Sequence, residues 1–480
     1  MNQAELPRSR FLANIVTILG GQFGTIAVAV LTEVCVARLL GPASRGQISL
    51  CTMAIWFGAV LGGMGGEVPI VIWSASLNKK FSEWISVILL WGGAGCVATV
   101  LLWAFVYGRW HSSTLQGVTP DLAWLVSISI PPAILFSYLI ALLMGTERFG
   151  QRATVTLLRS VTGLAGFLSL VAFDRRNSSA ALWGNWLGVA FGIVVASFFL
   201  RDAVHSKNWS VPKFGKEIRS GLLIGLRGQL GPLTTFFTYR LDVFVVNYFF
   251  NPTQVGIYAV GVAVSESLWQ IPQAVAVALF PRTARTAQEN AAAFTCLILR
   301  QVLLISCVSA AVIALASPLA IPLVFGARFA GAVAVILWLL PGTVALSMAK
   351  VSSADLGGRG KTGYASFFGV ACFVVTVVLD LALIPRWGIQ GAAVASSVAY
   401  MVMGILFLAA LRHELKVGWG EMLVPSRAEL ARYKEAGFGT LARLRPRRGS
   451  SPVAVPLGPE SSIYGSQSEP RGSRETKTAS

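Results

Sequence analysis

Long runs of apolar residues constrain this sequence more than any other feature. Residues 85–106, 122–144 and 302–324 are examples, and about 20 such residues let a helix cross a hydrocarbon core of about 30 Å. Inside a bilayer only helices and closed barrels satisfy every backbone group, and these runs are too long and too uniform for barrel strands. Because only 12% of the 480 residues are charged, the chain also lacks the polar surface of a soluble protein. The sequence predicts an all-α polytopic membrane protein.

Twelve apolar segments, separated by charged or turn-rich breaks, are predicted to be transmembrane helices. They cover residues 11–37, 46–73, 83–108, 121–146, 152–174, 180–200, 219–249, 254–281, 295–325, 329–354, 362–385 and 389–411. If the N-terminus lies inside, the inner loops hold most of the lysines and arginines, which predicts that both termini are cytoplasmic. Contact with anionic membrane lipids then explains the net charge of +18 without nucleic acid.

A Pro-x-x-x-Gly skeleton occurs twice, at residues 42–46 and 252–256, with an offset of 210 residues. Two six-helix bundles around a central cavity would follow from such a repeat, and this is a transporter pattern. The alternative is that two helix corners converged on the same turn chemistry. The predicted domains are an N-terminal bundle (1–200), a cytoplasmic linker (201–218), a C-terminal bundle (219–412) and a basic, largely disordered cytoplasmic tail (413–480).

Cations inside the predicted spans are the first candidates for a function, because each costs about 2.5–3.5 kcal/mol at a helix centre. Arg159, Arg227, Arg300 and Lys350 are predicted to share a level near the cytoplasmic side. They either snorkel to the interface or form a cationic mouth for an anionic headgroup. Arg227 is the strongest candidate, because it shares a helix face with a polar stripe made of Gly231, Thr234 and Thr238.

Arg240 and Asp242 lie deeper and point to different faces of one helix, so each needs a partner on another helix. We expect the facing half of the molecule to supply these partners. The other polar candidates at membrane depth are Gln22 and Glu33 in the first span, Glu67 in a glycine-rich stretch of the second span where helices can pack closely or break, and Glu266, Gln270 and Gln273 on one face of the eighth. For the acidic residues, two interpretations stay open: structural charge pairing, or binding of H⁺ or Na⁺.

No motif indicates an enzyme, a metal site or a bound cofactor. The segment 355–362 resembles a phosphate-binding loop, but Asp355 replaces the first glycine and the segment lies between two helices. The six cysteines fall within predicted spans, and the three histidines lie in loops, without metal-ligand spacing. We therefore expect a transport function rather than catalysis.

Several motifs in order along the chain resemble those of one known family. They are Ala37-Arg-Leu-Leu-Gly-Pro42, Arg240-Leu-Asp242, Val255-Gly-Ile-Tyr258, Phe280-Pro-Arg282, Val324-Phe-Gly326 and Ile384-Pro-Arg-Trp-Gly388. Their order and spacing over residues 11–411 resemble the polysaccharide-transport (Wzx-type) lipid-linked oligosaccharide flippases. This family belongs to the multidrug/oligosaccharidyl-lipid/polysaccharide exporter superfamily.

The resemblance implies flipping of a polyprenyl-pyrophosphate-linked glycan from the inner to the outer leaflet of a bacterial plasma membrane. It implies alternating access driven by an ion gradient or the membrane potential, and partners such as a polysaccharide polymerase and other assembly proteins. Cationic residues in the lumen would hold the pyrophosphate, with Arg227 and Arg240 as candidates.

Two other functions remain open from the sequence alone. A cation-coupled exporter of small molecules could use the same fold, and an acidic cavity would favour it. A membrane scaffold without transport activity, recruiting partners through its basic tail, is the third candidate.

Overall fold

The computed structural model describes residues 8–75, 81–173, 177–204, 216–283, 288–361 and 363–424, and all structural statements here refer to them. For some helical residues, including Gln22 and Arg227, only the backbone is described. The described residues up to Val424 form one compact unit. The predicted tail from residue 425 onward lies outside the described residues.

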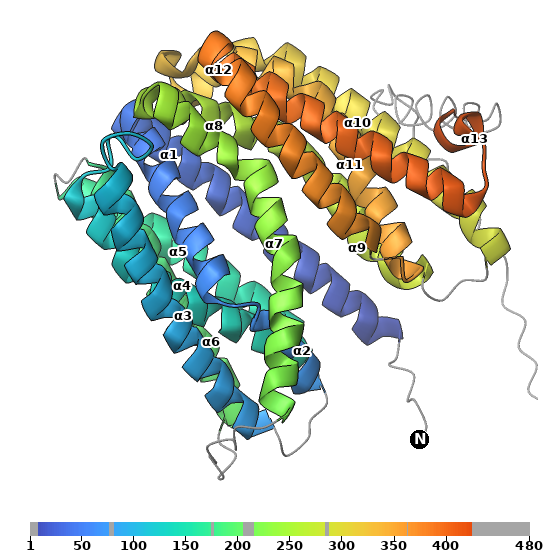
Figure 1. The fold of residues 1–480 in the computed structure, drawn as a ribbon, viewed down its shortest axis with the longest axis horizontal. Helices are drawn as coiled ribbons and strands as arrows, with labels where there is room; N and C mark the ends of the chain where they lie inside the picture. The colour runs from blue at the N-terminus through green and yellow to red at the C-terminus, as the bar shows by residue number, and fades with distance from the viewer. Residues whose placement is uncertain are drawn as a thin grey trace, which may run out of the picture. The chain divides into compact units, whose positions relative to one another are not determined.

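Helices account for nearly all of the described chain, and no strand occurs within it. Their bounds are α1 Arg8–Gly62, α2 Glu67–Ala75, α3 Phe81–Trp110, α4 Pro120–Gly145, α5 Phe149–Ala172, α6 Ser178–Val204, α7 Lys216–Phe249, α8 Pro252–Glu266, α9 Gln270–Thr283, α10 Gln288–Phe325, α11 Ala332–Gly358, α12 Gly363–Leu415 and α13 Trp419–Leu423, with short 3-10 helices η1 at Ser267–Trp269 and η2 at Ala327–Phe329. We call α1–α6 the N-terminal half and α7–α12 the C-terminal half. Helix α7 packs against α12 on one side and against α1 and α2 on the other (Figure 1).

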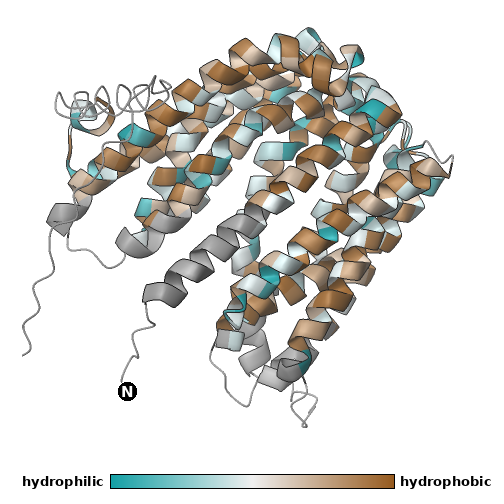
Figure 2. Cartoon of the chain, turned by 180° about the vertical axis from the view of Figure 1, so that it is seen from behind, coloured by the Kyte–Doolittle hydropathy of each residue, from teal (hydrophilic) through white to brown (hydrophobic). Residues whose placement is uncertain are grey.

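The long helices expose large apolar side chains along one face, as a membrane requires. On α10, Leu315, Leu319 and Leu323 are 84%, 75% and 67% exposed at a spacing of four residues, which places them on one face. Hydrophobic colouring covers most of the length of these helices (Figure 2). Eight helices in the described chain are long and apolar enough to cross a membrane. A surface of this kind is stable against lipid and not against water.

Glycines divide the two longest helices. Helix α1 has 55 residues and α12 has 53, but the backbone leaves helical geometry at Gly41 (φ 78°) and at Gly388 (φ 61°). Each helix is therefore two segments joined at a kink, because a positive φ strains any residue except glycine. The glycine-rich stretch before Glu67 interrupts the second predicted span, and α2 begins after it. The count of twelve transmembrane helices stays a prediction.

The repeated Pro-x-x-x-Gly motifs pack against each other where α1 crosses α8. A Cβ atom on Gly46 would clash with the backbone oxygen of Pro252, and one on Gly256 would clash with that of Pro42. The glycine of each motif thus allows the backbone of the other motif to approach closely, because it carries no side chain. This reciprocal contact is the arrangement that a two-fold repeat with its copies face to face produces.

Two amide side chains also join the halves, and we call Gln116 and Asn247 the amide latch. Gln116 Nε2 donates to the backbone oxygens of Asn247 and Phe250. Asn247 Nδ2 donates to the backbone oxygens of Thr114 at 2.8 Å and Gln116 at 3.1 Å. The connection between α3 and α4 is thereby fixed to the end of α7.

Candidate functional site

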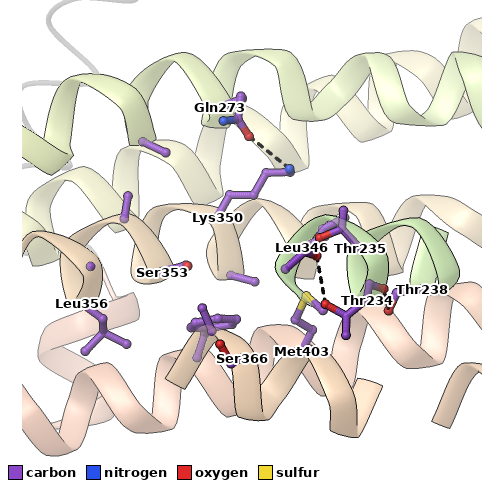
Figure 3. Close-up of a pocket in the computed structure, with 18 of the residues that line it drawn as sticks. Thr234, Thr235, Thr238, Gln273, Leu346, Lys350, Ser353, Leu356, Ser366 and Met403 are labelled. Atoms are coloured by element: carbon purple, nitrogen blue, oxygen red, sulfur yellow. Dashed lines mark hydrogen bonds between the residues drawn. The ribbon is translucent and has the colours of Figure 1, made fainter. Parts of the chain in front are cut away.

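A cavity of about 710 Å³ lies within the C-terminal half, among α7, α9, α11 and α12 (Figure 3). Its wall combines two lysines with hydroxyl, amide and small side chains and with large apolar and aromatic ones. The polar and small residues include Gly231, Thr234, Thr235, Thr238, Gln273, Lys350, Ser353, Lys361, Ser366 and Gly369, and the large ones are Tyr239, Leu346, Leu356, Met403 and Phe407. We call it the polar cavity. A cleft shared by both halves was expected from the sequence, but all the lining residues of this cavity come from the C-terminal half.

The polar stripe predicted on α7 forms one wall of the polar cavity. Gly231, Thr234 and Thr238 all line it, and a Cβ on Gly231 would meet only open space. The hydroxyls of Thr234 and Thr238 donate to the backbone oxygens of Gly231 and Thr234, at 2.9 and 2.8 Å. Since a hydroxyl oxygen has two lone pairs, that of Thr238 can still accept a hydrogen bond from a ligand. The side chain of Arg227 lies outside the described residues, so its role stays a prediction.

Lys350 carries the deepest charge in the lining. Its Nζ donates to Gln273 Oε1 at 3.1 Å and lies 4.7 Å from the centre of the Trp269 ring, so the two predicted residues Lys350 and Gln273 are held together (Figure 3). A ring face attracts a cation without neutralising it. Because an ammonium has three donors, this lysine can hold an anion while keeping its bond to Gln273.

Lys361 adds a second cation at the turn between α11 and α12. Its Nζ lies 3.2 Å from Glu414 Oε1, and its side chain is 52% exposed. The sequence analysis placed it in an accidental resemblance to a phosphate-binding loop and gave it no role. The neighbouring Asp355 is buried and bonds to Arg359 Nε at 2.6 Å and to Thr295 Oγ1 at 2.8 Å, so this carboxylate fixes the turn instead of facing a phosphate.

Arg240 forms a two-pronged ion pair with Glu266 of α8, with N–O distances of 2.6 and 2.7 Å. The expectation that the facing half supplies its partner is wrong, because α8 belongs to the same half. Residue spacing along one helix shows only that a partner is needed, not which helix provides it. The guanidinium is occupied by a carboxylate and is not part of the polar cavity's lining, so this geometry favours the structural pairing interpretation for Arg240 and Glu266.

Asp242 is buried and also finds its partners within the C-terminal half. It accepts hydrogen bonds from the Tyr258 hydroxyl, from Ser396 Oγ at 3.1 Å and from the backbone nitrogen of Val243 at 2.7 Å. Here too the expected partner from the facing half is wrong. Three donors around one carboxylate stabilise its ionised form.

Asp380 of α12 is a residue that the sequence analysis missed. It is fully buried, and neither carboxylate oxygen has a hydrogen-bond partner among the described residues. It lies close enough to Asp242 for the two carboxyl groups to interact electrostatically. A lone carboxylate within an apolar span was a signal available in the sequence. Asp380 is therefore a buried carboxyl without a hydrogen-bond donor among the described residues, whereas the buried carboxyl of Asp242 has three.

The remaining cations of the predicted mouth do not meet in the polar cavity. Arg159 of α5 lies over the Phe136 ring of α4, 4.8 Å from its centre. Arg300 of α10 donates to the backbone oxygen of Glu421 in α13 at 2.6 Å. Of the four residues predicted to share a level, Lys350 is the one whose described side chain lines the polar cavity.

The other predicted acidic and amide residues are not among the described residues that line the polar cavity, and those whose side chains are described each lie in a different environment. Glu33 pairs with the buried Arg45 across the Gly41 kink, at 2.7 Å. Glu67 is exposed in the first turn of α2, where an acid complements the helix dipole. Gln270 is exposed on α9, and the side chain of Gln22 lies outside the described residues.

Comparison with known proteins decides the family. Residues 35–334 match the family described as polysaccharide biosynthesis protein. The chain belongs to that family. The resemblance inferred from the motifs is confirmed, and with eight candidate spans the chain is a multi-pass membrane protein.

Two relatives illustrate this membership. The Haloferax volcanii protein Agl15, named for flipping in low-salt glycan biosynthesis, is 23% identical over 275 residues, which are 56% of this chain and 56% of that protein. A Shigella flexneri protein named for O-antigen transport is 24% identical over 323 residues, which are 65% of this chain and 75% of that protein. The chain thus spans little more than half the length of the first relative.

Solved structures share the fold at low sequence identity. The lipid II flippase MurJ in an inward closed conformation has a TM-score of 0.69 at 13% identity and covers 90% of this chain and 94% of its own. An inward-facing multidrug resistance MATE family transporter of the MOP superfamily has a TM-score of 0.59 at 14% identity, covering 82% and 94%. These likenesses show that the chain shares the fold of these proteins.

Proposed function

We propose that this protein flips a polyprenyl-pyrophosphate-linked oligosaccharide from the inner to the outer leaflet of a bacterial plasma membrane, for cell-surface or extracellular polysaccharide biosynthesis. The observation that carries the proposal is the polar cavity. It places Lys350 and Lys361 beside a wall of hydroxyls, within a membrane protein of the polysaccharide biosynthesis family.

The chemistry of the cavity suits such a headgroup. Pyrophosphate and sugars cannot enter hydrocarbon without groups that replace their water. Lysines complement the phosphates, while threonine and serine hydroxyls donate to or accept from sugar hydroxyls. Alternating access would present the cavity first to the inner and then to the outer leaflet, with both termini in the cytoplasm. A polysaccharide polymerase and other assembly proteins would then receive the product.

Coupling to H⁺ or Na⁺ forms part of the proposal, through Asp242 and Asp380. Both carboxyls are buried in the half that contains the polar cavity, on α7 and α12. A cation bound between them would neutralise charge that otherwise stays in a medium of low polarity. Because both helices also line the polar cavity, neutralisation here can change the packing of its walls.

Export of small organic cations is the second candidate function. The two buried carboxyls favour it in principle, since a cationic drug needs an acidic site. However, the charged side chains that line the polar cavity are the lysines Lys350 and Lys361. These repel cations, so we prefer the flippase.

Replacing Lys350 tests the proposal directly. We expect Lys350→Ala to lower surface-glycan export at least tenfold and to leave the lipid-linked intermediate in the inner leaflet, since one charge-assisted contact is worth about 1.5–3 kcal/mol. The matched control is Arg159→Ala, which removes a cation outside the cavity and should preserve export. Normal export in the Lys350→Ala variant, at wild-type protein levels, would contradict the proposed site.

A further inference from the structure

A second cavity lies between the two halves and differs in chemistry from the polar cavity. It has a volume of about 250 Å³ and is enclosed by α7 together with α1, α3, α4 and the α3–α4 connection. We call it the apolar cavity. The proposed function does not use it.

Hydrocarbon and aromatic groups form nearly all of its wall. Phe57, Trp103, Phe236 and Phe244 contribute rings, and no charged side chain occurs among the described lining residues. The indole nitrogen of Trp103 donates to the backbone oxygen of Ala123 at 3.0 Å, so its polar atom is satisfied by the protein. The hydroxyl of Thr99 is likewise bonded to the backbone oxygen of Gly95. Thr114 and the indole of Trp110 add the few other polar atoms of the lining. A ligand here would gain mainly dispersion contacts, which suits a hydrocarbon chain.

The rim of the apolar cavity is open to the surroundings of the protein. Leu102 and Trp110 of α3 both line it and are 44% and 40% exposed. The neighbouring residues Leu101 and Phe105 are 65% and 64% exposed on the same helix, so this side of α3 faces lipid. A chain can therefore enter sideways from the bilayer without passing through water.

The two cavities lie on different faces of α7. The residues of α7 that line the polar cavity are Gly231, Thr234, Thr235, Thr238 and Tyr239, and those that line the apolar cavity are Phe236, Phe237, Leu241 and Phe244. At 100° per residue the second set points away from the first.

The cavities also extend toward opposite ends of α7. Helix α12 runs in the same direction as α7, because Gly369 contacts Thr234 and Phe373 contacts Phe237. Lys361 therefore lies toward the beginning of α7, whereas the α3–α4 connection is bonded to Asn247 near its end. The outer end of the polar cavity at Lys361 and the outer end of the apolar cavity at the α3–α4 connection are about 20 residues of α7 apart. This separation is roughly 30 Å, which is close to the full hydrocarbon thickness.

We infer that the apolar cavity holds the distal part of the substrate's isoprenoid chain while its headgroup occupies the polar cavity. The inference rests on the proposed function. A polyprenyl chain of many isoprene units is longer than one leaflet and reaches both levels. An acyl chain of a phospholipid whose head lies beside Lys361 ends near the midplane, and so does not reach the α3–α4 end.

Packing, rather than the hydrophobic effect, would favour this placement. Lipid tails are as apolar as the cavity wall, so moving a chain from bilayer to protein gains little from leaving water. The gain comes from filling a fixed, ring-lined space with a chain of matching shape. We therefore expect the apolar cavity to raise the affinity for the substrate only modestly, but to fix the position of its isoprenoid chain.

Photolabelling can locate the chain. The purified full-length protein in nanodiscs would be mixed with a long-chain polyprenyl phosphate that carries a diazirine on its terminal isoprene unit. We expect labelled peptides from residues 99–110 and 236–244. Leu102→Trp, which fills the cavity from its rim, should lower this labelling at least threefold. The matched control Leu101→Trp adds the same ring to an adjacent lipid-facing position and should not.

Three outcomes would overturn the inference, and they differ from failure of the proposed function. Labelling confined to lipid-facing helices elsewhere would place the chain in the bilayer. Equal labelling in the Leu102→Trp and Leu101→Trp variants would show that the chain does not enter the apolar cavity. Loss of the label on adding excess phosphatidylglycerol alone would assign the cavity to a phospholipid. The headgroup is tested separately with geranyl phosphate, whose chain is too short to reach: if its binding does not depend on Lys350, the proposed function fails instead.

Discussion

The two halves of the molecule carry the same repeated motif but place charge differently. In the C-terminal half, the pairs Arg240–Glu266 and Asp355–Arg359 are fixed between or within helices at 2.6 Å, and the carboxyl of Asp380 is buried nearby. The N-terminal half also holds an ion pair, Glu33–Arg45 at 2.7 Å, but this pair lies within α1 and neither residue lines a cavity described above. Under the proposed function, the duplicated architecture would set the path of the backbone, while the headgroup would be recognised in one copy.

The largest effect should follow from breaking the ion pair that distinguishes the C-terminal half. We expect Arg240→Met to destabilise the protein by about 3–5 kcal/mol, because it leaves Glu266 buried without its partner. Thermal unfolding in detergent measures this. The double variant Arg240→Met/Glu266→Leu removes both charges and should recover most of the loss. If the single variant is as stable as the wild type, the pair has no structural role.

The two buried carboxyls should respond in opposite directions. Asp242→Asn loses acceptor capacity toward three donors and should cost about 1–3 kcal/mol. Asp380→Asn removes a carboxylate without partners and should match or exceed wild-type stability, yet abolish the dependence of flipping on a proton or sodium gradient. Flipping assays with each gradient imposed separately provide the measurement. Unchanged gradient dependence in both variants would leave these residues as structural groups.

Weakening the amide latch should change how the halves open. Gln116→Ala removes two hydrogen bonds between them, each worth about 1 kcal/mol, and should raise the open population at that end roughly 5–30-fold. The reaction of a cysteine introduced at Thr114 with a membrane-impermeant maleimide reports this population. Ser113→Ala in the same connection removes only a bond to Trp110 and serves as the control. An unchanged reaction rate in Gln116→Ala would show that other contacts close this end.

The smallest effect is expected in the N-terminal half. Arg159→Leu removes a cation from the face of Phe136, an interaction worth about 2 kcal/mol when it is desolvated, but it also removes the cost of keeping a charge away from water. Its unfolding temperature and its surface-glycan export should stay close to those of the wild type. A loss of export as large as that expected for Lys350→Ala would contradict the contrast between the halves.

Much of the architecture could be predicted because membranes impose simple rules. Apolar length identifies helices. The glycine-rich stretch before Glu67 was compatible with close packing or a break, and the structure shows the break, with α2 beginning after it. The spacing of Gly231, Thr234 and Thr238 predicted a polar face, since helical periodicity fixes which side chains share a side. These features depend on neighbouring residues along one helix.

Features that depend on contacts between helices could not be predicted in the same way. The spacing of Arg240 and Asp242 gave no information on which helix supplies Glu266 or Ser396. Arg159 and Lys350 were predicted to lie together because their positions along the spans imply a similar depth in the membrane. A shared depth does not show where each residue lies around the helix bundle. Asp380 was different, because its isolated charge was visible in the sequence and was overlooked.

The crossing of Gly46 and Gly256 has a consequence for motion. At the closest approach of α1 and α8 no side chain separates the two backbones, so no ridges interlock at that point, and the packed side chains of this crossing, such as Ala37 and Val260, lie away from it. A pivot made of bare backbone lets the helices swing without exchanging one set of side-chain contacts for another. The energy barrier to rotation of α1 against α8 must then come from contacts at a distance from this crossing. Substitutions at those contacts can therefore change the rate of the conformational change while the crossing itself stays unchanged.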